Sequence, residues 1–146
     1  MKRLILVLTL SLSFISFSSF AKEIDVNTSV LESFNSTFKN ATEVSWTTVD
    51  SYYKANFAFN GQYISAFYDA EGHMVAISRN ITTGQLPLGL QFALKKDYSN
   101  LWISDLFEIS GDEGTYYCIT LETGDTKIIL KSIGSSTWTV FKKASK

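Results

Sequence analysis

The sequence is poor in the residues on which many catalytic and disulfide-stabilised folds depend. It contains a single cysteine, Cys118, a single histidine, His73, and a single proline, Pro87. One cysteine cannot form an internal disulfide, and a metal site built on imidazoles usually needs more than one histidine. The 13 Lys and Arg residues do not exceed the 14 Asp and Glu residues, so nucleic acid is not expected as a partner. No glycine-rich phosphate loop and no GxSxG nucleophile elbow is present.

A long apolar run occurs only at the amino terminus. Lys2 and Arg3 precede an uncharged run over residues 4–20, and the small residues Ser19 and Ala21 flank a cleavage point. This pattern is typical of a secretory signal peptide cleaved after Ala21. The alternative is an N-terminal membrane anchor, but the run is shorter than the ~20 residues of a membrane span. We therefore predict a signal peptide over 1–21, one exported domain over 22–146, a periplasmic or secreted location and no stable membrane span.

Two helices are predicted in the exported domain. Val30, Phe34 and Phe38 recur at helical spacing, which predicts a helix over about 29–39, and Ser29 with Glu32 predicts a capping box at its start.

The second helix follows Pro87. Leu90 and Leu94 share one of its faces, while Gly89 should weaken it.

Alternating segments predict four strands after each helix. The segments are residues 43–49, 52–59, 62–68 and 73–79 in the first half, and 105–110, 115–122, 126–133 and 137–143 in the second half. Asn60-Gly61 between the second and third segments predicts a type I′ hairpin turn.

The halves match in pattern as well as in order. A shift of 64 residues places Tyr53 on Tyr117 and Ala55 on Ile119, and a shift of 63 places Val44 and Trp46 on Phe107 and Ile109. We therefore expect an α+β fold: a tandem repeat of a helix plus a four-stranded antiparallel meander, over about 28–80 and 84–143. Both helices should cover one face of the sheet in a two-layer sandwich.

Candidate catalytic groups are few. The carboxylate pairs Asp69/Glu71 and Asp112/Glu113 lie in turn signals, where Asp is favoured for its local hydrogen bonds. His73 is expected at an exposed strand start, and Cys118 as a small buried hydrophobe. The sequence thus predicts no catalytic residues, no metal site, no cofactor and no enzyme. A hydrolase that uses the four carboxylates remains an alternative.

The first hairpin carries aromatic side chains on both faces. Closure on Asn60-Gly61 pairs Phe57 with Ile64 and Tyr53 with Tyr68 on the core side, and Lys54 with Phe67 on the other side. That second side, which we call the open face, is the face of the sheet not covered by the helices. Its candidate binding residues are Tyr52, Lys54, Tyr63, Phe67, Lys127 and Lys131. Aromatic groups interleaved with polar ones are typical of a protein-binding surface, and an ordinary solvated face is the alternative.

The motifs of the chain resemble a known family. They are V-x-W at Val44, Y-x-A-x-F at Tyr53 with Gly61, A-x-Y-D at Ala66 with Gly72, Leu86-Pro87, and YY-x-I at Tyr116. The sequence resembles the β-lactamase-inhibitor-like, PepSY-like proteins of Bacteroidetes periplasms over about residues 30–146. The resemblance implies a tandem α+β repeat with a concave open sheet. The disulfides of the inhibitor that names the family have no counterpart, and no inhibitory contact can be placed here, so β-lactamase inhibition is not predicted.

The expected function is an exported, non-enzymatic module that binds a protein or peptide on the open face, as an inhibitor or a regulator. The alternative is a periplasmic carrier of a small apolar ligand, for which the sheet would curl into a cup.

Overall fold

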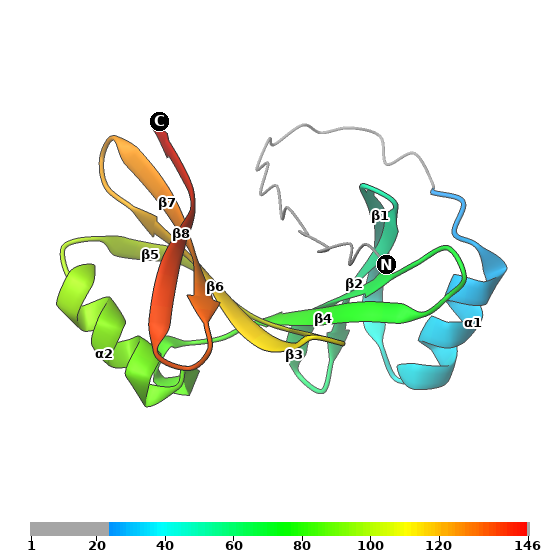
Figure 1. The fold of residues 1–146 in the computed structure, drawn as a ribbon. Helices are drawn as coiled ribbons and strands as arrows, with labels where there is room; N and C mark the ends of the chain where they lie inside the picture. The colour runs from blue at the N-terminus through cyan, green and yellow to red at the C-terminus, as the bar shows by residue number, and fades with distance from the viewer. Residues whose placement is uncertain (1–23, 146) are drawn as a thin grey trace, which may run out of the picture.

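The computed structural model describes residues 24–145, so the expected signal peptide over 1–21 lies outside the described residues. The fold is α+β and consists mostly of sheet (Figure 1). In chain order the elements are α1 (Thr28–Thr37), β1 (Thr42–Val49), β2 (Tyr52–Phe59), β3 (Gln62–Tyr68), β4 (Met74–Asn80), η1 (Thr83–Gln85), α2 (Leu88–Asp97), β5 (Trp102–Gly111), β6 (Gly114–Glu122), β7 (Thr126–Ile133) and β8 (Thr137–Ser145). Neither described helix is long and apolar enough to cross a membrane.

All eight strands form one antiparallel sheet in which each strand pairs with its neighbours along the chain. The β2–β3 hairpin has the expected register, with Phe57 opposite Ile64 and Lys54 opposite Phe67. Its turn residues Asn60 and Gly61 have φ angles of 50° and 75°, as a type I′ turn requires. The predicted hairpin is confirmed.

The first hydrophobic cluster joins α1 to β2 and β3. Val30, Phe34 and Phe38 are buried against Phe57 and its neighbours, and the Phe34 and Phe57 rings meet edge to face with centroids 5.0 Å apart. The predicted capping box is wrong, because the N-cap of α1 is Asn27, and Ser29 lies inside the first turn of the helix. The side chain of Asn27 caps it by accepting a hydrogen bond from the Ser29 amide.

The second cluster joins α2 to the strands of the second half. Leu90 and Leu94 are buried among Leu106, Ile119, Leu121, Leu130 and Trp138. The indole Nε1 of Trp138 donates a hydrogen bond to the Leu90 carbonyl oxygen at 3.0 Å, which ties β8 to the helix. Gly89 permits this approach, because a Cβ there would lie 2.8 Å from the Ser135 carbonyl oxygen.

The alignment of β5 with β1 differs from the prediction. Trp46 pairs with Ala55, whereas the residue opposite Ile119 is Leu106 and not Ile109. Ile109 pairs with Tyr116 and points to the opposite side of the sheet from Leu106. The expected match of Val44 and Trp46 with Phe107 and Ile109 is therefore wrong.

The sheet is strongly bent. In Figure 1, β1 rises on one side and β7 and β8 rise on the other, while β3, β4 and β6 run through the narrower middle. The two helices lie at the far ends of the molecule. Among residues 24–145, the only strand pair that links the two halves is β4–β5, over Ala76–Asn80 and Phe107–Gly111.

Candidate functional site: the open face

The open face has buried apolar side chains of its own. Phe67 on β3 and Ile109 on β5 are 1% and 2% exposed, yet neither belongs to the two helix-containing clusters. Phe67 alternates with the cluster residues Ala66 and Tyr68, so it points to the other side of the sheet. Phe67 is a predicted binding residue of the open face, but its ring is buried, so it also contributes to the packing of the fold.

Lys54 lies over the buried Phe67 ring. Its ammonium nitrogen is 5.6 Å from the ring centroid, a cation–π contact between the two residues that the predicted register pairs. Burial lowers the pKa of Lys54. The pair gives the β2–β3 part of the open face a cation fixed on an aromatic platform.

A second lysine–aromatic pair occupies the other half of the open face. Lys131 Nζ on β7 lies 4.0 Å from the centroid of the Tyr116 ring on β6. Burial, followed by the charges of Cys118 and Glu113, raises the pKa of Tyr116 to about 12. The sequence analysis named Lys131 but missed Tyr116. Tyr116 could have been found from the strand pairing. Lys131 pairs with Cys118, and Tyr116 lies two residues from Cys118 on the same side of β6, so Tyr116 is a diagonal neighbour of Lys131.

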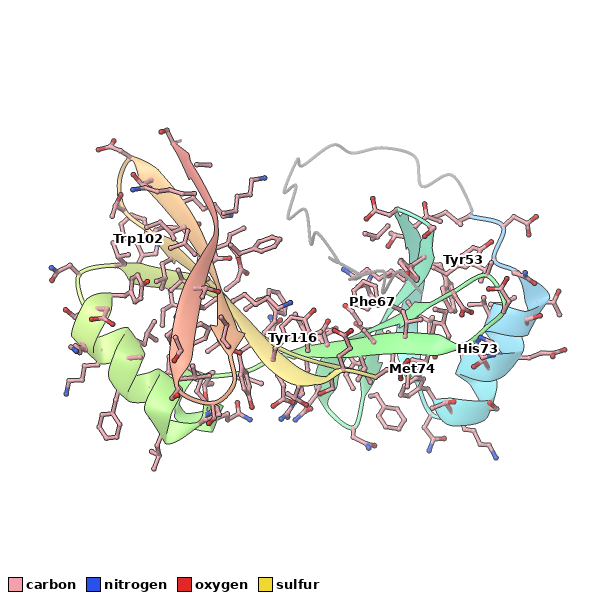
Figure 2. All side chains as sticks on the ribbon, in the orientation of Figure 1. Tyr53, Phe67, His73, Met74, Trp102 and Tyr116 are labelled. Carbon is pink, nitrogen blue, oxygen red and sulfur yellow. The ribbon has the colours of Figure 1, made fainter. Side chains whose placement is uncertain are left out.

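A cavity of about 350 Å³ lies between these two pairs. Its lining residues come from β2, β4, β5, β6 and the β5–β6 turn: Tyr52, Val75, Ala76, Ile109, Gly111, Asp112, Glu113, Gly114 and Tyr116. Figure 2 shows Tyr116 at the narrow middle of the molecule. Of the predicted binding residues, only Tyr52 lines this cavity. We call it the open-face pocket.

Two further predicted binding residues, Tyr63 and Lys127, do not line the pocket. Tyr63 is 70% exposed near the β2–β3 turn, and its hydroxyl donates to Glu43 Oε2 at 3.0 Å. Lys127 lies on β7 next to Glu122, with 3.7 Å between the ammonium nitrogen and the carboxylate oxygen. The structure thus places Tyr52, Lys54 and Phe67 on neighbouring strands, but it does not gather all six predicted residues into one site.

His73, Asp69 and Cys118, which were considered as catalytic candidates, have the following surroundings. His73 is exposed, with its Nδ1 3.0 Å from Asp69 Oδ2, and its backbone N–H also donates to Asp69. Burial alone would raise the pKa of Asp69, but the hydrogen bonds from His73 outweigh it and lower that pKa. Burial raises the pKa of the Cys118 thiol to about 11, which opposes thiolate chemistry near neutral pH. Within residues 24–145, no three His, Cys, Asp or Glu side chains are grouped as a metal site would require.

The chain is similar to known proteins in structure, but no similar sequence was found. No protein-family model matches the chain, and no curated protein matches it. Among solved structures, a proposed periplasmic protein from Bacteroides eggerthii DSM 20697 is 15% identical, with a TM-score of 0.73 over 82% of this chain and 88% of that one. A DUF2874 family protein from Bacteroides uniformis ATCC 8492 is 16% identical, with a TM-score of 0.71 over 81% and 88%.

A third similar structure belongs to a protein described as β-lactamase-inhibitor-like (BLIP-like). It is a BLIP-like protein from Bacteroides fragilis NCTC 9343, 18% identical, with a TM-score of 0.66 over 84% of this chain and 87% of that one. At these identities the likeness concerns the fold alone. The resemblance expected from the motifs is confirmed at that level: the chain has the fold of the BLIP-like and DUF2874 proteins of Bacteroides.

Proposed function

We propose that the chain is an exported, non-enzymatic binding module that holds a protein or peptide on the open face of its sheet. The observation that carries this proposal is the open-face pocket between two lysine–aromatic pairs. Aromatic and cationic side chains that are already fixed in place are typical of binding hot spots, because little side-chain entropy remains to be lost on association.

The pairing of the strands supports an open face of this kind. Ala66 contacts α1 and pairs with Ile77, which in turn pairs with Ser110 on β5. Ser110 lies four residues from Leu106 on β5 and therefore faces the same side of the sheet as Leu106, which packs against α2. We infer from this row that both helices cover one face, that the chain is a tandem helix-plus-meander repeat, and that the opposite face is free for a partner.

The comparisons support the exported and non-enzymatic parts of the proposal. One structural neighbour is described as a proposed periplasmic protein, and another as BLIP-like. The amino-terminal sequence pattern is that of a signal peptide. Inhibition of a β-lactamase is not part of the proposal, because a shared fold does not carry a partner.

Site-specific photo-cross-linking in the periplasm tests the proposal. A photoreactive amino acid replaces Tyr63 or Thr139, both exposed on the open face, or, as the matched control, Glu32 on the outer side of α1. We expect discrete adducts from Tyr63 and Thr139 and none from Glu32. Identical adducts from all three positions, or none from the open face, would refute the proposal.

A carrier of a small apolar ligand is the second candidate, and one cavity favours it. A cavity of about 360 Å³ lies between α2 and β5, and Leu94, Tyr98, Leu101 and Leu121 contribute apolar walls. This volume is at the small end of ligand sites, which occupy ~300–1,000 Å³. Native mass spectrometry of the purified protein decides the matter, because a carrier retains a bound small molecule and a protein-binding module does not.

A further inference from the structure

A row of very small residues crosses the open face beside Phe67. Phe67 pairs with Ala76, Ala76 pairs with Gly111, and Gly111 pairs with Gly114. Three neighbouring strands therefore present one methyl group and two bare α-carbons. At Gly111 a Cβ would lie 2.7 Å from the Val75 carbonyl oxygen, so the position excludes any other residue without a backbone shift. The missing side chains open the pocket.

The residues around this bare row combine aromatic, aliphatic and acidic groups. The rings of Tyr52 and Tyr116 and the aliphatic side chain of Ile109 line the pocket. Asp112 and Glu113 line it from the β5–β6 turn, and both are exposed. Glu113 contributes to the raised pKa of the Tyr116 hydroxyl, so its charge acts within the pocket.

The two carboxylates have no cationic partner among residues 24–145: the ion pairs there involve other acids. Lys54 and Lys131 of the open face lie over the rings of Phe67 and Tyr116, and neither lysine lines the pocket. The charges that line the pocket are therefore both negative. The pocket complements a positively charged group with an apolar stem.

We propose that the open-face pocket receives an arginine side chain of the bound protein or peptide, an inference that rests on the proposed function. The methylene groups of the arginine pack over Ala76 and Ile109. The guanidinium lies on the Tyr52 ring, because the Lys131 ammonium already lies over the Tyr116 ring. Asp112 and Glu113 accept its hydrogen bonds. Arginine suits this site better than lysine because its planar, weakly hydrated guanidinium stacks on aromatic rings and donates two parallel hydrogen bonds to a carboxylate.

The test uses two tripeptides that differ only in charge. Acetyl-Gly-Arg-Gly-amide and its neutral isostere acetyl-Gly-citrulline-Gly-amide are titrated into the isotopically labelled protein, and the amide signals of Gly111 and Gly114 are followed by NMR. We expect the arginine peptide to shift these signals, with an apparent affinity that falls as salt is added, and the citrulline peptide to bind about tenfold more weakly or not at all.

The double variant Asp112→Asn/Glu113→Gln tests the role of the carboxylates without removing buried groups. Its matched control, Glu32→Gln/Asp125→Asn, makes the same charge change at exposed positions that do not line the pocket. We expect about a tenfold loss of affinity for the arginine peptide in the first variant and none in the second. Equal shifts by the arginine and citrulline peptides, or an unchanged affinity in the first variant, would overturn the inference.

The two proposals fail in different ways. If the photoreactive residue at position 63 or 139 yields cross-links but the arginine peptide leaves the Gly111 and Gly114 signals unshifted, the arginine pocket is wrong and the binding face stands. If the open-face positions yield no cross-links, the proposed function itself is wrong, whatever the peptides do.

Discussion

The substitution Gly89→Ala sets helix propensity against the packing of α2 on the β7–β8 turn. On propensity alone, alanine should stabilise a helix by up to ~1 kcal/mol relative to glycine, and by less near the helix start, where Gly89 lies. The structure predicts the opposite sign. The added Cβ would lie 2.8 Å from the Ser135 carbonyl oxygen, 2.8 Å from the Ser136 Cβ and 2.9 Å from the Ser136 Cα.

These contacts are with backbone atoms and a Cβ, so no side-chain rotation relieves them. Relief requires α2 to move away from the turn, which also stretches the 3.0 Å hydrogen bond from Trp138 to Leu90. Overpacking of this kind costs ~1–3 kcal/mol. After the helix-propensity gain, we expect a net loss of about 1–2 kcal/mol and a melting temperature lower by about 4–8 °C.

Urea unfolding followed by circular dichroism measures the loss, and the NMR signal of the Trp138 indole N–H reports the stretched bond. Gly124→Ala is the matched control, because a Cβ at Gly124 meets no atom within 4 Å and Gly124 does not have a positive φ. It should change stability by less than ~0.5 kcal/mol. A Gly89→Ala protein as stable as the wild type, with an unshifted Trp138 signal, would refute the close packing of α2 on β8.

Three further predictions follow from buried groups. Tyr68→Phe should stabilise the fold by about 1 kcal/mol in urea unfolding, because the Tyr68 hydroxyl is buried without a hydrogen-bond partner among residues 24–145; a loss of stability would reveal a partner. Phe67→Ala should cost ~3–5 kcal/mol and Tyr63→Ala less than ~0.5 kcal/mol in the same assay, since one ring is buried and the other 70% exposed; equal losses would contradict the burial of Phe67. Cys118 should react slowly with iodoacetamide at pH 8 and faster as the pH rises towards about 11, because burial raises the pKa of its thiol and the reactive thiolate forms only near that value; rapid labelling at pH 7 would contradict this.

Local patterns predicted the elements and the first hairpin well. Asn60-Gly61 fixes the β2–β3 register, so the Lys54–Phe67 contact could be placed from the sequence. The β5 register could not be predicted in the same way. Leu106, Phe107 and Ile109 are all apolar, so alternation does not reveal which side faces α2, and an irregular register between Ile103 and Asp105 shifts the strand.

The proposed binding site was harder to predict than the fold. Its pocket depends on Ala76 meeting Gly111 across the β4–β5 pair, and the helix α2 lies between these strands in the sequence. No turn signal sets that register. The burial of Phe67 likewise depends on the bend of the whole sheet, a property that period-two alternation does not encode.

The separation of the two hydrophobic clusters along the chain bears on how the protein folds. The first cluster uses residues only up to Ile77, and the second begins at Ile81. Every strand pair joins neighbours in the sequence, so loop-closure entropy is small throughout, and it is largest where β5 must find β4 across α2. The amino-terminal half can therefore complete its core while the rest of the chain is still emerging from the ribosome. The β4–β5 ladder is the late step that makes the two halves one cooperative unit.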